Sequence, residues 1–358
     1  MVAFTLKGNK RCPFSLFWWV LTGSNRRPSV RQTDALPAEL NTQIAGTVSI
    51  KQHDYYTYLL FLVKVFVKQS MKVFNSNAKI LLNMKITNYI ESLDSFKNKK
   101  IVLLGGTSGI GLCLLNHLVY KHSQVILLAL EDDVANKLKE EYSLLDVIHY
   151  DQSSFESIDS AINELLKKHE DFDTIVMNVG VLNQTRLLDN GYPATIGINY
   201  IGARYFIDNI STKLSQNVKF VMAGSFAAML SFNKKLDLKS TKRNALKQYN
   251  ASKAYLEAYF YKLSTEKPYP NIEYVLAEPG LTNTAIINGF NKVVRFLGKY
   301  FLKWFFHSPN KASLGLLLGI SSKSKNGDFI TPRGILHLSG YPKIRKLPSN
   351  RRKVYLFK

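Results

Sequence analysis

The chain has 358 residues, of which 46% are hydrophobic and 21% are charged, so it can bury a sizeable core and is not a wholly disordered chain. Its formal net charge is +22, yet no cluster of Lys and Arg with interleaved aromatic residues marks a nucleic-acid-binding module, and we expect no nucleic-acid partner. Cys12 and Cys113 are too few for a disulfide framework or a Cys-rich zinc site, so we expect a reducing, cytoplasmic environment and no metal site.

Residues 1–83 lack the periodic apolar pattern of a packed domain, and we expect an N-terminal extension with little fixed structure. Three interpretations of this segment are open. In the first, the apolar run 12–21 follows basic residues as in a signal peptide. In the second, the apolar run 55–67 is a membrane anchor, although about 20 apolar residues are needed to cross a bilayer and this run contains Lys64.

Back-translation favours the third interpretation, in which this segment is not natural protein sequence. Three short stretches can be encoded by the complement of tRNA elements, namely an acceptor end with CCA, the T-arm and the D-arm. They lie at residues 18–20, 23–25 and 35–40, in the order that an antisense reading of one tRNA gene requires. We therefore expect translation to start at Met84 or Met71, and a native peptide from residues 15–45 would contradict this expectation.

From residue 100 onward, short apolar runs alternate with amphipathic stretches of roughly ten to fifteen residues. The runs that we interpret as strands are 101–104, 125–128, 147–150, 175–177, 220–223, 274–277 and, with a weaker pattern, 329–331. They are almost continuously apolar, which is typical of parallel strands buried on both faces. Helical patterns lie between them, for example at 158–168 and 249–263.

This alternation predicts an α/β fold of the Rossmann type, with a doubly wound parallel sheet of about seven strands and helices on both faces. No repeat, low-complexity tract or Pro-rich linker interrupts residues 84–358. We therefore expect these residues to form a single domain.

A glycine-rich turn, Gly105-Gly106-Thr107-Ser108-Gly109-Ile110-Gly111, follows the first strand directly and leads into a helical pattern. The pyrophosphate of a dinucleotide binds backbone N–H groups at a helix N-terminus, and side chains would block that approach. The position of the turn between strand and helix favours dinucleotide binding over an ordinary tight turn. The predicted cofactor-binding residues here are Gly105, Thr107, Ser108, Gly109, Ile110 and Gly111.

The spacing G-x-x-x-G-I-G resembles that of the short-chain dehydrogenase/reductases, and further motifs of that family follow in order along the chain. The resemblance implies that Asp151 lies at the adenine ring. It also implies that Asn178 and Gly180, in Met177-Asn178-Val179-Gly180, form the family's Asn-Asn-Ala-Gly turn. Met177, Val179 and Leu104 depart from the family pattern. After the sixth strand, Pro279, Gly280 and Thr284 match the residues that contact the nicotinamide carboxamide.

The choice between NAD and NADP depends on the end of the second strand, Ala129-Leu130-Glu131-Asp132. An acid there holds the ribose hydroxyls of NAD, whereas an arginine accommodates the 2′-phosphate of NADP. Glu131 can bind a ribose, or it can be a solvated residue of the next turn. Since no arginine is present, the sequence leans to NAD.

Tyr249 and Lys253, in Tyr249-Asn250-Ala251-Ser252-Lys253, lie one helical turn apart and share a face of the predicted helix. A carbonyl that receives a hydride needs a proton donor at its oxygen. An unperturbed tyrosine has a pKa near 10, and a nearby ammonium group favours its phenolate form. The pair is therefore predicted to be catalytic, and in the family the lysine and tyrosine also contact the cofactor.

Two further residues complete the catalytic set that the resemblance implies. Ser225 ends the fifth strand and matches the serine that hydrogen-bonds the substrate oxygen. Asn199 matches the asparagine that holds a water in the proton relay. Each alone would be a structural residue, the serine in a turn and the asparagine at a helix kink, but the four residues stand in the family's order.

Ser225 and Tyr249 are 24 residues apart in the numbering, a longer gap than many family members have, and this resembles the retinol dehydrogenase-like and carbonyl-reducing branches. The segment 226–248 is rich in lysine, which fits either a dock for an anionic group or a solvated loop. The segment 293–307 is rich in aromatic residues. It fits a lid over a hydrophobic substrate, a peripheral contact with a membrane surface, or plain helix packing.

These features predict an NAD(P)-dependent oxidoreductase that acts on a small hydrophobic alcohol or carbonyl compound. The resemblance also implies a homo-oligomer. One alternative is a non-catalytic dinucleotide sensor of the same fold that regulates a partner. Such proteins tend to lose the tyrosine or the lysine, and here Tyr249 and Lys253 both stand. Epimerases and dehydratases of this fold usually show a different glycine spacing and a larger C-terminal domain.

Overall fold

The computed structural model describes residues 83–93, 96, 98–130, 132–182, 186–231, 237–241, 244–280, 282, 308–334 and 340–352. All of them belong to a compact unit that spans residues 77–358. The expectations for residues 1–82, Glu131, Thr284 and the segment 293–307 lie outside the described residues. In the part of the chain that is described, no helix combines the length and the apolar character that a membrane span requires.

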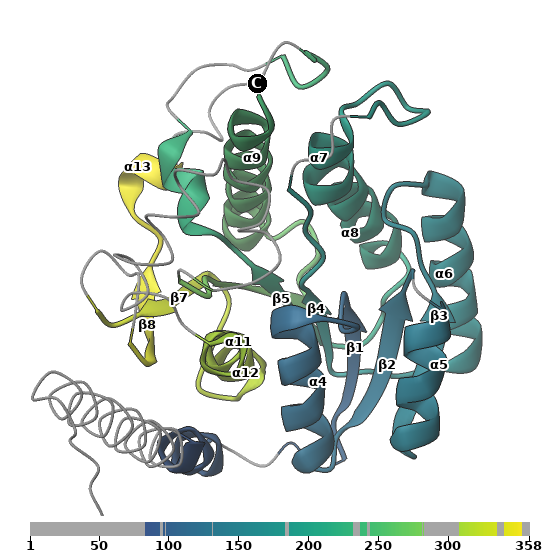
Figure 1. The fold of residues 1–358 in the computed structure, drawn as a ribbon, viewed down its shortest axis with the longest axis vertical. Helices are drawn as coiled ribbons and strands as arrows, with labels where there is room; N and C mark the ends of the chain where they lie inside the picture. The colour runs from purple at the N-terminus through teal and green to yellow at the C-terminus, as the bar shows by residue number, and fades with distance from the viewer. Residues whose placement is uncertain are drawn as a thin grey trace, which may run out of the picture. The chain divides into compact units, whose positions relative to one another are not determined.

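An eight-stranded sheet forms the centre of the unit, in the order β3-β2-β1-β4-β5-β6-β7-β8 (Figure 1). The strands are β1 Lys100–Leu104, β2 Gln124–Ala129, β3 Leu145–His149, β4 Thr174–Met177, β5 Val218–Ala223, β6 Ile272–Ala277, β7 Asp328–Pro332 and β8 Pro342–Lys346. Strands β1 to β7 are parallel, and β8 pairs antiparallel with β7. The predicted doubly wound α/β fold is therefore confirmed, with one more strand than the sequence indicated.

Strand β8 escaped the sequence analysis because it is an edge strand. Its sequence, Pro-Lys-Ile-Arg-Lys, has exposed basic residues between its apolar positions. A search for continuous apolar runs does not find such a strand. Exposed lysines on an edge strand are a common device against pairing with another chain.

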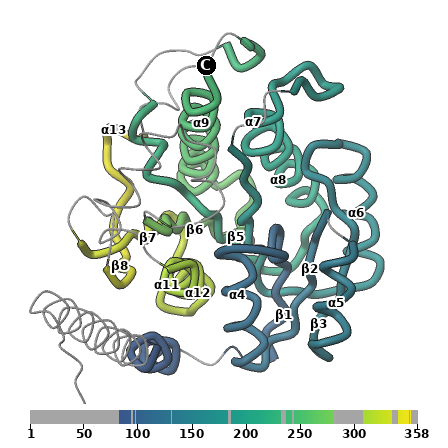
Figure 2. Tube along the Cα trace, viewed as in Figure 1, coloured from purple at the N-terminus to yellow at the C-terminus, as the bar shows by residue number. Residues whose placement is uncertain are grey.

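Helices connect the strands and cover both faces of the sheet (Figure 2). A first helix spans residues 83–91. The labelled helices are α4 Gly109–Tyr120, α5 Asp132–Glu141, α6 Phe155–Lys168, α7 Ala194–Ile196, α8 Ala203–Ser211, α9 Ala245–Glu266, α11 Pro309–Ala312, α12 Leu314–Ile320 and α13 Ser349–Arg352. A π-helical segment, Gly197–Gly202, joins α7 to α8, and a 3-10 turn, Phe226–Leu230, follows β5.

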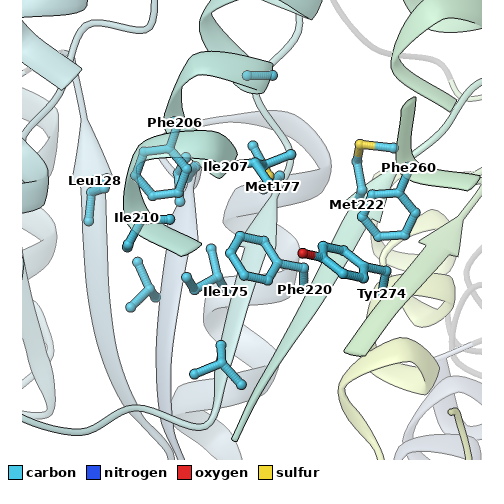
Figure 3. Packing of buried hydrophobic residues seen from close by; sticks show 14 of the residues in the cluster. Leu128, Ile175, Met177, Phe206, Ile207, Ile210, Phe220, Met222, Phe260 and Tyr274 are labelled. Atoms are coloured by element: carbon cyan, nitrogen blue, oxygen red, sulfur yellow. The ribbon is translucent and has the colours of Figure 1, made fainter. Parts of the chain in front are cut away.

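Two hydrophobic cores form because successive strand residues point to opposite faces of the sheet. Ile175 and Met177 of β4 face α6, α8 and α9, where they belong to a core with Phe206, Phe220 and Tyr274 (Figure 3). Val176, which lies between Ile175 and Met177, points to the other face and belongs to a second core that includes residues of α4, α5 and α12. Burial on both faces explains why the parallel strands are almost continuously apolar.

The strand order changes direction between β1 and β4. From β1 the chain builds the sheet outward through β2 and β3 on one side, and then continues through β4 and β5 on the other side. Ligands of open α/β sheets bind outside the carboxyl ends of the strands at such a switch point. The fold therefore directs attention to the turns that follow β1, β2 and β4.

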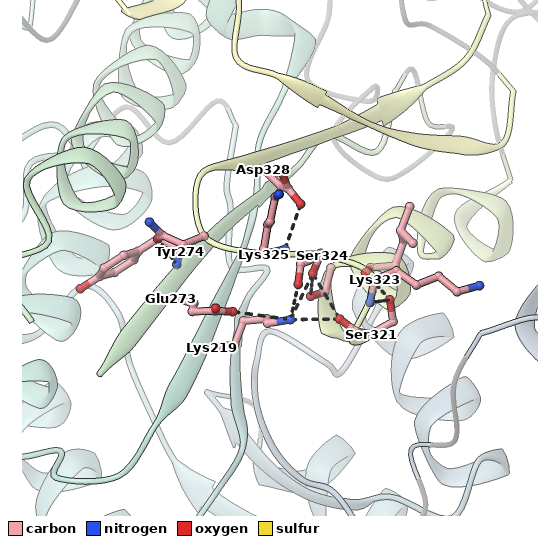
Figure 4. Close-up of polar contacts among 11 residues, drawn as sticks. Lys219, Glu273, Tyr274, Ser321, Lys323, Ser324, Lys325 and Asp328 are labelled. Atoms are coloured by element: carbon pink, nitrogen blue, oxygen red, sulfur yellow. Dashed lines mark hydrogen bonds and ion pairs between the residues drawn. The ribbon is translucent and has the colours of Figure 1, made fainter. Parts of the chain in front are cut away.

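Lys219 of β5 joins the sheet to the end of α12 (Figure 4). Its ammonium group donates to the carbonyl oxygens of Ser321 at 3.0 Å and Ser324 at 2.9 Å, and lies 3.9 Å from the carboxylate of Glu273. The last carbonyl groups of a helix lack intrahelical partners and carry partial negative charge. Lys219 therefore adds a charged donor to two carbonyl groups in a mostly buried place, where the Ser321 carbonyl also accepts from Ser324.

We expect Lys219→Met to lower the free energy of unfolding by about 2 kcal/mol, since buried carbonyl groups lose a charged donor. Urea unfolding measures this change. Lys346→Met on β8 is the matched control, because Lys346 is exposed on the edge strand and its loss should change stability very little. Equal stability of the two variants would contradict the role assigned to Lys219.

Candidate active site

The glycine turn after β1 has a conformation that glycine alone fits well. Gly109 has φ of +56°, in the left-handed region. At Gly111, an added Cβ would lie 1.9 Å from the carbonyl oxygen of Gly105, which is backbone and cannot move aside. Asn178, after β4, holds the same turn: its side-chain amide donates to the Gly105 oxygen at 2.9 Å. The turn is thus a tightly packed cradle in which the glycine positions leave the backbone accessible to a ligand.

Helix α4 begins at this turn with its N–H groups unused. The Ser108 side chain makes no capping hydrogen bond, and no acidic residue lies in the first turn of the helix. A helix N-terminus carries partial positive charge and binds anions through its free N–H groups. The cradle and the uncapped helix fit the pyrophosphate of a dinucleotide.

A cleft of about 400 Å³ opens beside the turn at the switch point of the sheet. The predicted residues that line it are Gly105, Thr107, Ser108, Gly109, Ile110, Asp151, Asn178 and Gly180. The structure adds lining residues that the sequence analysis did not single out, namely Leu128, Ala129, Leu130, Tyr150, Gln152, Val179, Val181 and Ile198. Most of them lie at the end of β2, β3 or β4 or directly after it. The carboxyl ends of the predicted strands could therefore have indicated these residues.

Asp151 and Asn178 line the cleft, and each side chain also makes a hydrogen bond to the protein backbone. The Asp151 carboxylate accepts the N–H of Ser153 at 2.8 Å, and this fixes the turn after β3. Of the departures from the family pattern, Leu104 and Met177 are buried in the core and do not reach the cleft lining, whereas Val179 lines the cleft. The hydrogen bond from Asn178 to Gly105 is still made, so the backbone of the cradle is intact.

Helix α9 carries Tyr249 and Lys253 on one face, as its periodicity predicted. Both side chains are buried, with exposed fractions of 8% and 4%. Burial lowers the pKa of Lys253 to about 8, while the nearby Glu257 carboxylate opposes this shift. Near neutral pH the lysine is therefore still mostly cationic.

Ser225 lies beside the Tyr249 hydroxyl. Burial raises the pKa of Tyr249, a hydrogen bond with the Ser225 side chain lowers it, and the charge of Glu257 raises it again. Burial is the largest of these effects, so in the protein alone the tyrosine keeps its proton throughout the physiological range. A protonated phenol is the form that can donate a proton.

Asn199 is fully buried in the π-helical segment, and its side chain makes three hydrogen bonds to protein groups. Its Oδ1 accepts the N–H of Val181 at 2.7 Å, and its Nδ2 donates to the Val181 oxygen at 2.9 Å and to the Ser252 hydroxyl at 3.1 Å. The Ser252 hydroxyl in turn donates to the backbone oxygen of Tyr249. The side chain thus joins the turn after β4 to helix α9, and π-helical insertions of this kind are frequent at functional sites.

The catalytic residues and the cleft are neighbours. Gly180 lines the cleft, and an added Cβ at this position would lie 3.2 Å from the Lys253 ammonium group. Val181 lines the cleft and bonds Asn199. Tyr249, Ser225, Lys253 and Asn199 are not themselves among the residues that line the cleft where the structure describes it.

Pro279 and Gly280 follow β6, where Gly280 turns the chain with φ of +76°. Neither is a lining residue of the cleft in the described part of the chain. Glu131 and Thr284 lie outside the described residues, so their predicted roles stay predictions.

Sequence reasoning missed three buried charged side chains next to Ser225, which we call the acid–arginine cluster: Glu257, Glu278 and Arg351. Their exposed fractions are 1%, 1% and 5%. Arg351 bonds both carboxylates, at 2.6 Å for Glu257 and 3.1 Å for Glu278. No local motif joins residues so far apart in the sequence, and only the fold brings them together.

Glu278 is the weaker-bound acid of this cluster. Its Oε2 accepts from Arg351, while its Oε1 has no partner in the described structure. Burial raises the pKa of Glu278 to about 7, and the charge of Glu257 adds to the shift while Arg351 opposes it. The folded protein therefore binds a proton more tightly here than the unfolded chain does.

The raised pKa of Glu278 makes the stability of the folded protein depend on pH. A carboxyl whose pKa is raised from 4.5 to about 7 on folding makes stability fall as pH rises through that window. We expect Glu278→Gln to flatten this dependence and to be more stable than the wild type at pH 8 by about 2 kcal/mol. Urea unfolding between pH 5 and pH 8 is the measurement, with Glu140→Gln on the exposed face of α5 as control. Parallel pH curves for wild type and Glu278→Gln would reject this account of Glu278.

Comparison with known proteins gives the family. The model of the short chain dehydrogenase family matches residues 99–293. No curated protein matches the chain.

Among solved structures, an uncharacterized protein from Mycobacterium paratuberculosis is similar with 16% identity and a TM-score of 0.59, covering 75% of this chain and 92% of that one. A short-chain dehydrogenase/reductase from Brucella melitensis, described as glucose/ribitol dehydrogenase, has 18% identity and a TM-score of 0.51, with coverage of 64% and 91%. A 3-ketoacyl-(acyl-carrier-protein) reductase from Brucella melitensis, complexed with NADH, has 18% identity and a TM-score of 0.50, with coverage of 64% and 93%. At these identities the likeness concerns the fold, whereas the family model covers more than half of the sequence. The chain belongs to the short chain dehydrogenase family.

Proposed function

We propose that this chain is an NAD(P)-dependent oxidoreductase that transfers a hydride between nicotinamide and a hydrophobic alcohol or carbonyl compound. One observation carries the proposal: a buried Tyr249, hydrogen-bonded to Ser225 and one helical turn from Lys253, lies next to a cleft built on the glycine turn. Family membership supports the reaction class, and the arrangement of the side chains supports the assignment of roles.

The cofactor's pyrophosphate would bind the N–H groups at the start of α4, and its adenine would lie toward Asp151. Gly180 would bring the nicotinamide end toward Lys253 and Tyr249. A bound nicotinamide supplies the hydride for reduction of a carbonyl carbon, or accepts it in the reverse direction.

The protein's own residues handle the proton. Tyr249 holds a proton at its phenolic oxygen and passes it to the carbonyl oxygen as negative charge develops there. The Ser225 hydroxyl, within hydrogen-bonding reach of Tyr249, holds that same oxygen in place. The Lys253 ammonium group favours the phenolate that remains, and Asn199 holds α9 in register with the turn after β4.

The acidic start of α5 favours NAD over NADP. Asp132 and Asp133 occupy the first turn of this helix, directly after β2, and the Asp132 carboxylate accepts from the His149 ring at 2.9 Å. A 2′-phosphate near these carboxylates would be repelled. We therefore expect a lower KM for NADH than for NADPH, which initial-rate kinetics with each cofactor measures; a lower KM for NADPH would contradict this.

We assign the chain to the retinol dehydrogenase-like, carbonyl-reducing branch on the long gap between Ser225 and Tyr249 and the aromatic character of residues 293–307. That segment would cover a long-chain or ring-containing substrate, and it can also touch a membrane surface. Residues 84–358 would form the catalytic domain, and we expect it to associate into a homo-oligomer.

The experiment that tests the function follows NADH and NADPH absorbance with the full chain and a panel of long-chain and ring-containing aldehydes, ketones and alcohols. We expect turnover on at least one hydrophobic panel member, with short polar substrates as the comparison. Tight cofactor binding without turnover on any member would contradict the catalytic proposal and favour the dinucleotide sensor.

A further inference from the structure

The acid–arginine cluster is buried where charge is costly, and this calls for an explanation. Taking ions out of water is unfavourable, and buried ion pairs are often no more stabilising than apolar residues of similar volume. Glu257, Glu278 and Arg351 are nevertheless almost fully buried. Stability alone is therefore a weak reason for their presence.

Glu257 and Arg351 hydrogen-bond the backbone of Ser225, and Glu278 accepts from Arg351. Glu257 lies one helical turn beyond Lys253 on α9, and its Oε1 accepts the backbone N–H of Ser225 at 3.0 Å. Arg351 donates to the backbone oxygen of Ser225 at 3.0 Å. Glu278 directly precedes Pro279 at the end of β6. The backbone of Ser225 is thus held on both its N–H and its carbonyl side by the cluster.

Arg351 comes from a distant part of the chain. It lies on α13, which follows the antiparallel strand β8 and packs beside α9 (Figure 1). Its Nε donates to Oε2 of Glu257 at 3.0 Å and its Nη2 donates to Oε1 at 2.7 Å, and the guanidinium lies 4.9 Å from the centre of the Phe329 ring. This fixed, two-pronged geometry is specific to arginine. It orients the Glu257 carboxylate toward Ser225.

The cluster also acts on charge. Burial raises the pKa of Glu257, while Arg351 opposes this shift and favours the ionised carboxylate, which in turn favours the cationic form of Lys253. The charged groups that meet here are Lys253 and Glu257 of α9, Glu278 after β6, and Arg351 of α13. Without the Arg351–Glu257 interaction, burial would act on Lys253 with less opposition. The pKa of Lys253 would fall, and its ammonium form would be lost at a lower pH.

We propose that the acid–arginine cluster is a positioning device, in which Arg351 orients Glu257 so that Glu257 fixes the backbone of Ser225 and keeps Lys253 cationic. This rests on the proposed oxidoreductase function. Neither Arg351 nor Glu257 touches the substrate in this account; both act through Ser225 and Lys253.

The test compares the wild type with the neutral triple variant Glu257→Gln/Glu278→Gln/Arg351→Met in the full chain. The triple variant leaves no unpaired charge within the cluster, and Lys253 can release its proton, so we expect the variant to fold. Arg351→Met alone is a second variant, and Arg345→Met, at an exposed position of β8, is the matched control. The readouts are urea unfolding, cofactor affinity, the pH profile of kcat, and amide hydrogen exchange in the peptide that contains Ser225.

We expect the triple variant to bind cofactor as the wild type does, but to lose roughly tenfold in kcat at pH 8 because its alkaline limb moves to lower pH. We also expect faster amide exchange at Ser225 and no change in Arg345→Met. An unchanged pH profile and unchanged exchange in the triple variant would overturn the proposal, since a merely structural cluster would not move the profile.

Failure of the function itself gives a different result. If the wild type shows no turnover on any substrate, the oxidoreductase proposal fails, and amide exchange alone then decides the positioning proposal. Faster exchange at Ser225 in the folded triple variant supports it, whereas unchanged exchange rejects it.

Discussion

Replacing Tyr249 by phenylalanine is expected to lower kcat by about a thousandfold, the middle to upper range for removal of a general acid or base. The substitution removes only the phenolic oxygen from a side chain that is 8% exposed, and the ring keeps its packing. The hydride would still be positioned, but no proton would be available at the carbonyl oxygen. Steady-state kinetics of NADH oxidation measures the loss.

Two controls separate this effect from unfolding and from loss of cofactor. NADH affinity, measured by fluorescence, should change very little in Tyr249→Phe, because the cleft is lined by other residues. Tyr255→Phe, on the same helix outside the catalytic set, should keep nearly full turnover. Turnover within about tenfold of the wild type in Tyr249→Phe would remove the tyrosine from its assigned role.

Gly111→Ala is expected to abolish measurable cofactor binding. The new methyl group would lie 1.9 Å from the Gly105 oxygen, so the glycine turn and the start of α4 must separate. That movement distorts the N–H groups that would hold the pyrophosphate. We expect at least a hundredfold rise in the Kd for NADH, which isothermal titration measures, and a lower melting temperature.

Gly315→Ala is the matched control, since Gly315 also lies in a helix, α12. An added Cβ there meets its nearest neighbours at 3.7 and 3.9 Å, which is ordinary contact. Alanine in a helix interior is favoured over glycine by about 0.5–1 kcal/mol, so this variant should be as stable as the wild type or more so. Normal NADH affinity in Gly111→Ala would show that the turn is not the pyrophosphate site.

The parts of the fold that the sequence predicted are those with a strong local pattern. Most residues of β1, β2, β4, β5, β6 and β7 are buried on both faces of the sheet, so the sequences of these strands are almost continuously apolar and stand out, whereas the edge strand β3 is only partly buried. The glycine turn and the Tyr249–Lys253 spacing are also local, and each lies within a short stretch of chain. The branch of the family, the substrate and the choice of cofactor depend on side chains from several loops, and the sequence gives only indirect signals for these.

What the sequence analysis missed depends on long-range contact. Strand β8 is exposed and basic, so its pairing with β7 cannot be read from its composition. Arg351 is brought to Ser225 over a separation of 126 residues. Asn199 was expected to hold a water in the proton relay, and that role stays a prediction. The sequence did not indicate the three hydrogen bonds that its side chain makes to protein groups.

Hydride transfer is the central claim, and isotope transfer tests it most directly. NADH deuterated at the reactive carbon of its nicotinamide ring would be incubated with the full chain and a hydrophobic aldehyde or ketone, and the alcohol product analysed by mass spectrometry. The account predicts that the product carries deuterium on its carbinol carbon, and that Tyr249→Phe forms it about a thousandfold more slowly. Cofactor binding without any deuterated alcohol from any substrate would contradict it.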